Sequence, residues 1–255
     1  MLSSRRRNER PDGPFYMERG WISSAIFLAF LLVMALVAFM ADSGNATLAA
    51  GSRDALAKVQ GPLSPGDPQH VRNKRSGRPH NCRTNDDDSK VPTARPHDLR
   101  WRKLVAVMVP TLPDAGPTHV DPTMWWCFAH TPMGAILAAH IIPIEIGGPD
   151  WRTAVEQQVV SGKARDRLVA RRIAVDTADP AQSAAGRFAG FSVRTYSAET
   201  ADIRLLMTDP LGGYLSTSVS LRWREGDWKV SPQTDGSLYA AAVKTEPNGF
   251  VVWGG

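Results

Sequence analysis

One uninterrupted apolar run constrains this chain more than any other feature. Gly20 to Ala41 forms 22 consecutive residues without a charged side chain, and Trp21 stands near its start. As a helix the run would be about 33 Å long, enough to cross a hydrocarbon core of about 30 Å. A helix satisfies its own backbone hydrogen bonds, which lipid cannot do, and an indole suits the headgroup boundary. The sequence therefore predicts a transmembrane helix over residues 20–41, in contact with membrane lipid.

The charged residues on either side of this run predict its orientation. Lysine and arginine near the ends of a span favour the cytoplasmic side, whereas acidic residues contribute little. One basic residue, Arg53, lies between residues 41 and 56. Five lie before the run, namely Arg5, Arg6, Arg7, Arg10 and Arg19. We therefore expect a cytoplasmic tail at residues 1–19, a single-pass anchor in the cell membrane and an extracytoplasmic C-terminal region.

A cleaved signal peptide is the alternative interpretation of the same run. The run is longer than the apolar core of about 7–15 residues that signal peptides have, and Phe39 disrupts a small-x-small cleavage site ending at Ala41. Thr47 and Ala49 could still serve a later cleavage site. We favour a retained anchor and leave cleavage open.

Polar residues and prolines dominate the stretch after the span. Residues 42–96 contain six prolines, the first at Pro62, and few aliphatic residues in series. Such a segment cannot bury enough apolar surface to offset the entropy of an ordered chain. We therefore predict a disordered linker at residues 42–96. One folded domain follows at residues 97–255, and its length of about 160 residues suffices for a hydrophobic core.

The distribution of charge argues against a nucleic-acid-binding domain. The whole chain carries a formal net charge of +5. Residues 97–255 contain 16 basic and 16 acidic residues, so the excess of 14 basic over 9 acidic residues lies in the first 96 residues. A domain without net positive charge lacks the electrostatic attraction that nucleic-acid binding requires. The basic tail is explained by membrane orientation and by anionic lipid.

Helical signals come first in the predicted domain. Thr131 and Pro132 are typical of a helix start, because a hydroxyl can cap free backbone N–H groups and a proline suits the first turn. We expect this helix to run to about Ile142. Asp150 is expected to cap a second helix at residues 151–172.

Strand signals flank the helices on both sides. Residues 99–109 predict a strand or a lead-in segment, and prolines and glycines then predict an irregular loop at residues 110–122. Period-two alternation after residue 190 predicts antiparallel strands, including 214–224 and 227–231 joined by a tight turn at Gly226. Helices followed by an antiparallel run predict an α+β fold, with the helices covering the concave face of a curved sheet.

The two cysteines allow two interpretations. Cys82 lies in the predicted linker and Cys127 in the predicted domain, and outside the cytoplasm the two could form a disulfide. Apolar neighbours instead favour a buried, unpaired Cys127, since free cysteine is among the most buried residue types. Those neighbours are Trp125, Trp126 and Phe128. We favour the unpaired cysteine and leave the pairing open.

Reactive residue types gather in one part of the sequence only. Cys127 and His130 stand three residues apart, with Asp121 nearby, while His140 could face a pocket together with Glu145. A structural metal site needs four ligands, and a thiol nucleophile needs a base within hydrogen-bond distance. The chain also contains no G-x-S-x-G, phosphate-loop or H-E-x-x-H motif. We therefore predict no enzyme activity and assign no catalytic, cofactor-binding or metal-ligating residue.

Two stretches carry a resemblance to known families. The segment SVSLRWREGDWKV (residues 218–230) is similar to the terminal hairpins of NTF2-like domains. The order of tail, span, linker and outer domain resembles the VirB8-like family of type IV secretion and conjugation systems. The segment CFAHTPMGAILAAHII (residues 127–142) is similar to membrane proteins of actinobacterial conjugative elements. The resemblance implies an NTF2-like (cystatin-like) cone over residues 97–255.

The function implied by this resemblance is assembly rather than catalysis. We expect a non-catalytic, membrane-anchored scaffold of a conjugation or type IV secretion-like apparatus, which contacts other membrane proteins of that apparatus or a second copy of itself. The alternative is an extracytoplasmic ligand-binding or hydrolytic domain tethered to the membrane, because NTF2-like domains include enzymes and fold alone does not decide function.

Overall fold

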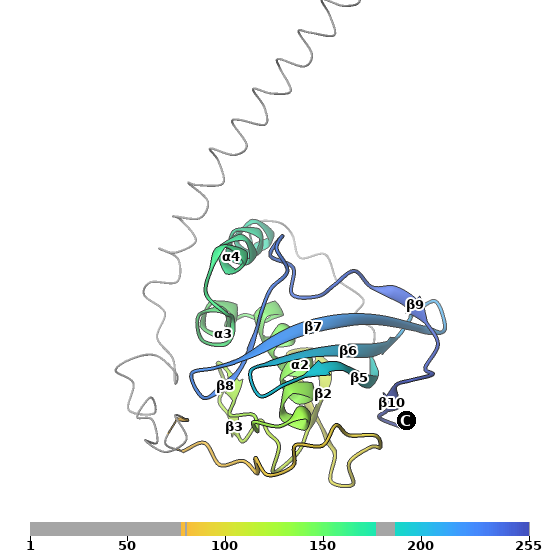
Figure 1. Cartoon of the computed structure of the whole chain (residues 1–255). Helices are drawn as coiled ribbons and strands as arrows, with labels where there is room; N and C mark the ends of the chain where they lie inside the picture. Colours follow the sequence, from red (N-terminus) through yellow and green to blue (C-terminus); the bar gives the residue numbers. More distant parts are fainter. Residues whose placement is uncertain (1–77, 80, 177–186, 255) are drawn as a thin grey trace, which may run out of the picture. The chain divides into compact units, whose positions relative to one another are not determined.

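Strands dominate the part of the chain that the computed structural model describes, which is residues 78–79, 81–176 and 187–254 (Figure 1). Three helices are present in these residues: α2 (Pro132–Gly147), α3 (Trp151–Gln158) and α4 (Lys163–Asp176). The strands are β1 (Arg100–Leu104), β2 (Val107–Thr111), β3 (His119–Val120), β4 (Trp125–Trp126), β5 (Phe188–Tyr196), β6 (Thr200–Thr208), β7 (Tyr214–Arg224), β8 (Asp227–Val230), β9 (Val243–Thr245) and β10 (Val251–Val252). The predicted anchor, the cytoplasmic tail and residues 42–77 of the predicted linker lie outside the described residues.

The largest sheet is antiparallel throughout and follows the order β10-β5-β6-β7-β8, with β9 pairing the start of β7. The predicted hairpin at its end is confirmed, because β7 and β8 pair from Leu221 with Val230 to Arg224 with Asp227. Glu225 and Gly226 both have positive φ, at 56° and 81°, as a two-residue hairpin turn requires. Gly226 therefore occupies the turn position with the larger positive φ, a conformation that glycine adopts without steric strain.

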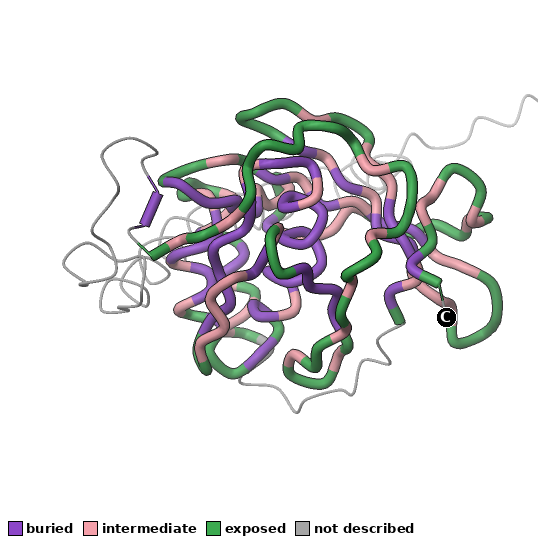
Figure 2. Tube along the Cα trace, turned by 90° about the horizontal axis from the view of Figure 1, so that it is seen from below, coloured by how far each residue is buried: buried purple, intermediate pink, exposed green. Residues whose placement is uncertain are grey.

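Helix α2 forms the centre of the core. Its predicted start is confirmed, since the Thr131 hydroxyl accepts a hydrogen bond from Gly134 N at 3.1 Å. The helix continues to Gly147, past the predicted end at Ile142, and is buried along most of its length. It packs against β5, β6, β7 and β8 (Figure 1), and the buried residues gather in the interior of the described part of the chain (Figure 2).

The predicted single helix over residues 151–172 is wrong, because the chain forms α3 and α4 with a break between them. Val159 leaves the helix and forms a parallel bridge to Val230 at the end of β8. Val160 N then donates to Val230 O at 2.9 Å, and Gly162 turns the chain with φ of 139°. Pairing with the sheet replaces helical hydrogen bonds here, and helix periodicity alone cannot indicate that competition.

The stretch before α2 contains two further antiparallel sheets. Strands β1 and β2 form a hairpin from Arg100 to Thr111, and β3 pairs with β4. The loop predicted at residues 110–122 therefore contributes the end of β2 and the whole of β3.

The predicted fold class, an NTF2-like (cystatin-like) cone of helices on one curved antiparallel sheet, is wrong. The described residues form a sheet-rich domain with three helices, and its strands divide among three separate sheets. Residues 78–79 and 81–96, which composition assigned to a disordered linker, contact the domain and are bonded to it. None of the described helices is long and apolar enough to cross a membrane.

Candidate functional site

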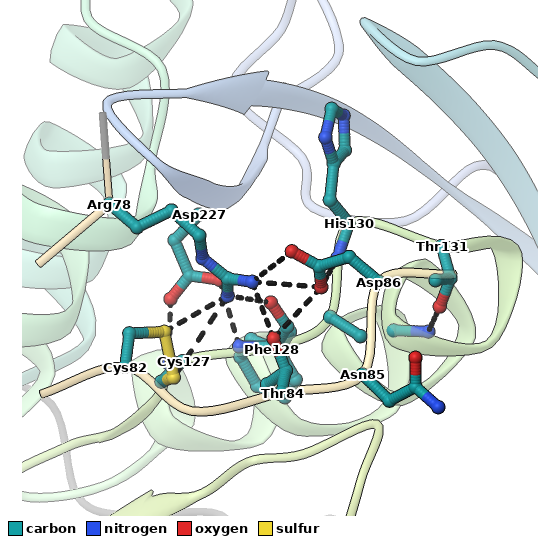
Figure 3. Close-up of polar contacts among 12 residues, drawn as sticks. Arg78, Cys82, Thr84, Asn85, Asp86, Cys127, Phe128, His130, Thr131 and Asp227 are labelled. Carbon is teal, nitrogen blue, oxygen red and sulfur yellow. Dashed lines mark hydrogen bonds and ion pairs between the residues drawn. A yellow bond between two sulfur atoms is a disulfide. The ribbon is translucent and has the colours of Figure 1, made fainter. Parts of the chain in front are cut away.

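A disulfide joins the segment that precedes the domain to the domain itself. We name Arg78, Pro79 and residues 81–96 the strap. Cys82 of the strap is bonded to Cys127, with their Cα atoms 5.4 Å apart (Figure 3). The favoured prediction of an unpaired Cys127 is therefore wrong. Its apolar neighbours correctly indicated burial, but they could not indicate a partner 45 residues earlier in the chain.

Arg78 connects the strap to the disulfide and to the loop before α2. Its side chain is 6% exposed, and Nη1 lies 2.8 and 2.6 Å from the two carboxylate oxygens of Asp86. Nη2 lies 2.9 Å from Cys82 Sγ and donates to Phe128 O. A guanidinium can make several such contacts at once because its donors are fixed in one plane. Arg78 thus binds both its own segment and the domain (Figure 3).

Asp86 forms the second attachment of the strap. Its Oδ1 accepts a hydrogen bond from His130 N at 2.8 Å and another from the Thr84 hydroxyl at 2.8 Å. Partial burial alone would raise the pKa of Asp86. The hydrogen bond from His130 N, the Arg78 guanidinium and the Thr84 hydroxyl outweigh that effect and hold its pKa below the ordinary value. Asp86 is therefore ionised at neutral pH and paired with Arg78.

Asp227 supports the same loop from the other side. The carboxylate is buried at the start of β8 and accepts hydrogen bonds from Cys127 N at 2.7 Å and Phe128 N at 3.0 Å. It therefore fixes Cys127, whose φ of 70° is unusual for a residue with a side chain. Burial raises the pKa of Asp227 to about 6, although Arg78 and these backbone hydrogen bonds oppose the change.

These five residues form a closed network, which we name the clamp: Arg78, Cys82, Asp86, Cys127 and Asp227. Both cysteine sulfurs are consumed in the disulfide, and the guanidinium is close to both carboxylates. The clamp has no thiol left to act as a nucleophile. Its chemistry is attachment, because it fixes the strap covalently and electrostatically to the loop that leads into α2.

His140 lies in the core and not in a site open to solvent. Nδ1 lies 2.7 Å from Ile136 O, so this nitrogen carries the proton, and Nε2 accepts from Trp253 Nε1 at 3.3 Å. Burial lowers the pKa of His140 to about 4, and the hydrogen bond to Ile136 O opposes that change only in part. The imidazole is therefore neutral, and both of its nitrogens are engaged within the fold.

The other residues singled out from the sequence lie at separate places. The His130 ring stacks on Trp223, with centroids 3.9 Å apart, and its Nε2 contacts Ala198 O at 2.6 Å. Asp121 accepts from Trp126 Nε1 at 3.0 Å. Within the part of the chain that the structure describes, no group of three or more His, Cys, Asp and Glu residues could hold a metal ion.

Glu145 is buried and does not share a pocket with His140. Its Oε1 accepts a hydrogen bond from Trp125 N. Burial raises the pKa of Glu145 well above its ordinary value, the hydrogen bond from Trp125 N opposes this, and the negative charge of Asp227 adds to it. Glu145 therefore holds a proton to a higher pH than an exposed glutamate does.

A cleft of about 680 Å³ opens between the β1–β2 hairpin and one end of the main sheet. Its walls include Trp101 and Met108 from the hairpin, Phe188 from β5 and Val252 from β10. Sequence reasoning missed this cleft, because its walls come from segments as far apart as Trp101 and Val252, which no local pattern connects.

The fold and the clamp together define a sheet-rich domain that is covalently tied to its own leading segment. The chain belongs to the family described as "Domain of unknown function (DUF8175)", whose model matches residues 64–252. The match begins before the strap and ends in β10, so it covers every strand and helix described above. No curated protein and no solved structure matches the chain significantly.

Proposed function

We propose that this protein is a non-catalytic, membrane-anchored assembly component whose domain works outside the cytoplasm. The observation that carries the proposal is the disulfide between Cys82 and Cys127. Structural disulfides form and persist in oxidising compartments and are rare in the cytosol. The apolar run at residues 20–41 and the arginines before it independently favour the same location for the domain.

The position of the disulfide also suits a tethered component. A protein held by an anchor transmits any pull from the membrane through the chain that enters its domain. In this chain the strap is fixed by a covalent bond and by the ion pair between Arg78 and Asp86. Such an attachment keeps the start of the domain in place while partners bind elsewhere on its surface.

The kind of assembly is proposed from sequence resemblance. Residues 127–142 are similar to membrane proteins of conjugative elements, and this segment forms the loop held by the clamp together with most of α2. We propose a conjugation or type IV secretion-like apparatus, with other membrane proteins of that apparatus or a second copy of the chain as partners.

Thiol labelling of the full-length protein in cells tests the location. Cells are treated with a maleimide–polyethylene glycol reagent after denaturation, with and without prior reduction. We expect no mass increase without reduction and two additions per chain after it. A Cys82→Ser variant serves as the control and should show one addition in both samples. Free thiols in the unreduced wild-type protein would refute the extracytoplasmic assignment.

Site-specific photo-crosslinking tests the assembly role. Leu211 is suited to the probe, because it is 91% exposed in the β6–β7 loop and replacing it disturbs no packing. We expect crosslinks to a second copy or to membrane proteins of the transfer apparatus, whereas a probe at the buried Val219 should give none. A full-length protein that stays monomeric and captures no partner from several exposed positions would contradict the proposal.

A tethered ligand-binding or hydrolytic domain is the second candidate function. The cleft of about 680 Å³ favours the binding half of this alternative, because its volume is typical of small-molecule sites. The hydrolytic half has less support. Cys127 is consumed in the disulfide and both nitrogens of His140 are engaged in the core.

A further inference from the structure

The cleft combines an apolar wall with unusual exposure of large side chains. Met108 at the hairpin and Val252 at the edge strand are 49% and 44% exposed, and both line the cleft together with Trp101, Val107 and Phe188. Exposed apolar surface that is concave and contiguous is typical of ligand-binding sites. An apolar ligand could therefore bury its surface against this wall.

A row of three polar residues borders the same cleft. The register of the sheet places Arg187 before β5, Thr208 at the end of β6 and Tyr214 at the start of β7 next to one another. Thr208 N donates to Arg187 O at 2.9 Å, and Arg187 N donates to the Thr208 hydroxyl at 3.1 Å. These contacts hold Arg187 beside Thr208, the pairing of β6 with β7 places Tyr214 next to Thr208, and all three residues line the cleft.

The side chains of this row differ in whether the described residues supply them with a hydrogen-bond partner. Among the described residues, neither the Arg187 guanidinium nor the Tyr214 hydroxyl has a hydrogen-bond or ion-pair partner, whereas the Thr208 hydroxyl is occupied by the Arg187 backbone. The described lining of the cleft contains no Asp or Glu. An anionic group would therefore find two donors here, and a cationic group would find no carboxylate.

We propose that the cleft binds a molecule with an aliphatic chain that ends in an anionic oxygen group, a carboxylate or a phosphate. The chain lies against Met108, Val252 and the aromatic wall, and the anionic end accepts hydrogen bonds from Arg187 and Tyr214. Guanidinium groups favour such oxygens because their paired donors match carboxylate and phosphate geometry. Free fatty acids and anionic lipids share this chemistry. The site goes beyond the assembly role and does not depend on it.

Photoaffinity labelling of the full-length chain in phosphatidylcholine nanodiscs tests the site. The probe is dodecanoate with a diazirine at the end of its chain, used below its micelle-forming concentration. We expect labelled peptides that contain Met108 or Val252. Unlabelled dodecanoate should compete, and dodecyltrimethylammonium, which has the same chain and a cationic head, should not.

Matched variants separate the site from general lipid partition. Arg187→Gln should reduce labelling of these peptides about tenfold, because one charge-assisted contact is lost, and Tyr214→Phe should reduce it several-fold. Arg194→Gln is the control, since Arg194 is an exposed arginine within β5, the strand that follows Arg187, and does not line the cleft. Equal labelling of Arg187→Gln and Arg194→Gln, or equal competition by the cationic amphiphile, would overturn the proposal.

Nanodiscs that contain phosphatidylglycerol then identify the source of the ligand. Competition by this anionic lipid would support the site and assign it to lipid headgroups. Labelling that is unchanged by the lipid but still sensitive to Arg187→Gln would support the site and assign it to free fatty acids.

Discussion

Arg78 and Arg187 are two arginines of the same domain with opposite surroundings. The Arg78 guanidinium is buried in the clamp and contacts a carboxylate, a disulfide and a backbone carbonyl. Arg187 is exposed and lines the cleft, and its guanidinium has no partner among the described residues. A buried network resists change because the loss of one member leaves other buried groups unpaired, whereas a donor at a cleft with no partner in the fold can be lost at little cost to stability.

This difference separates two roles that a charged residue can have. The clamp residues should determine how stable the domain is, and the residues beside the cleft should determine what it binds. Stability measurements on a fragment that begins at residue 64, the first residue of the family match, can test the division directly.

Loss of the disulfide should have the largest effect on stability. Replacing both Cys82 and Cys127 by Ser removes a cross-link between residues that are 45 positions apart. The unfolded chain then gains the entropy of an open loop, which is expected to lower the free energy of unfolding by about 4 kcal/mol. Urea denaturation followed by circular dichroism measures the change. Reducing agent should destabilise the wild type by a similar amount and leave the double variant unaffected. A loss below about 1 kcal/mol would show that the clamp does not depend on its covalent bond.

Removal of the clamp arginine should have the next largest effect. Arg78→Met keeps an apolar stem of similar length but leaves the buried carboxylate of Asp227 and the half-buried Asp86 without their cation. Breaking a partly buried ion pair in this way is expected to cost about 3 kcal/mol. The same denaturation experiment applies, with Arg194→Met as the control, since substitutions of an exposed arginine usually change stability by less than about 0.5 kcal/mol. Equal stability of the two variants would mean that the Arg78 contacts contribute nothing.

The pH dependence of stability should reveal opposing contributions from buried groups, above all Asp227 and His140. The pKa of Asp227 is about 6 in the folded state, compared with an ordinary value of 3.8 in the unfolded chain. Between these two pH values the folded state binds more protons than the unfolded state, so stability falls as the pH rises. The pKa of His140 is about 4 in the folded state, compared with an ordinary value of 6.5 in the unfolded chain. The unfolded state therefore binds more protons between these values, so the contribution of His140 to stability falls as the pH is lowered. The two effects oppose each other in the wild type, and Glu145, whose pKa burial also raises, adds to the effect of Asp227.

Asp227→Asn removes one side of this balance. Relative to the wild type, the variant should lose about 3 kcal/mol more stability between pH 6 and pH 4, because the contribution of Asp227 no longer opposes that of His140. Urea denaturation at four pH values over this range measures the difference. The control is Asp114→Asn, at an exposed carboxylate, and it should follow the wild-type curve. A parallel curve for Asp227→Asn would exclude a raised pKa at this residue.

The features that sequence predicted correctly are those encoded within a few residues. Thr131 caps α2 through a donor three residues ahead, and Gly226 supplies the positive φ of a turn between adjacent strands. In contrast, the bond from Cys82 to Cys127 and the hydrogen bonds from the Cys127–Phe128 backbone to Asp227 join residues 45 to 100 positions apart. Composition therefore placed the strap in a disordered linker, although its stability comes from distant partners and not from apolar residues of its own.

The smallest expected effects on stability belong to the cleft. Arg187→Gln and Tyr214→Phe remove a guanidinium and a hydroxyl that have no partner among the described residues. Each should change the free energy of unfolding by less than about 0.5 kcal/mol in the same denaturation experiment. Their near-neutral stability would combine with reduced labelling by the dodecanoate probe to show a binding role. A loss of 2 kcal/mol or more would instead mean that these groups support the fold, and the difference between Arg78 and Arg187 would then be one of exposure alone.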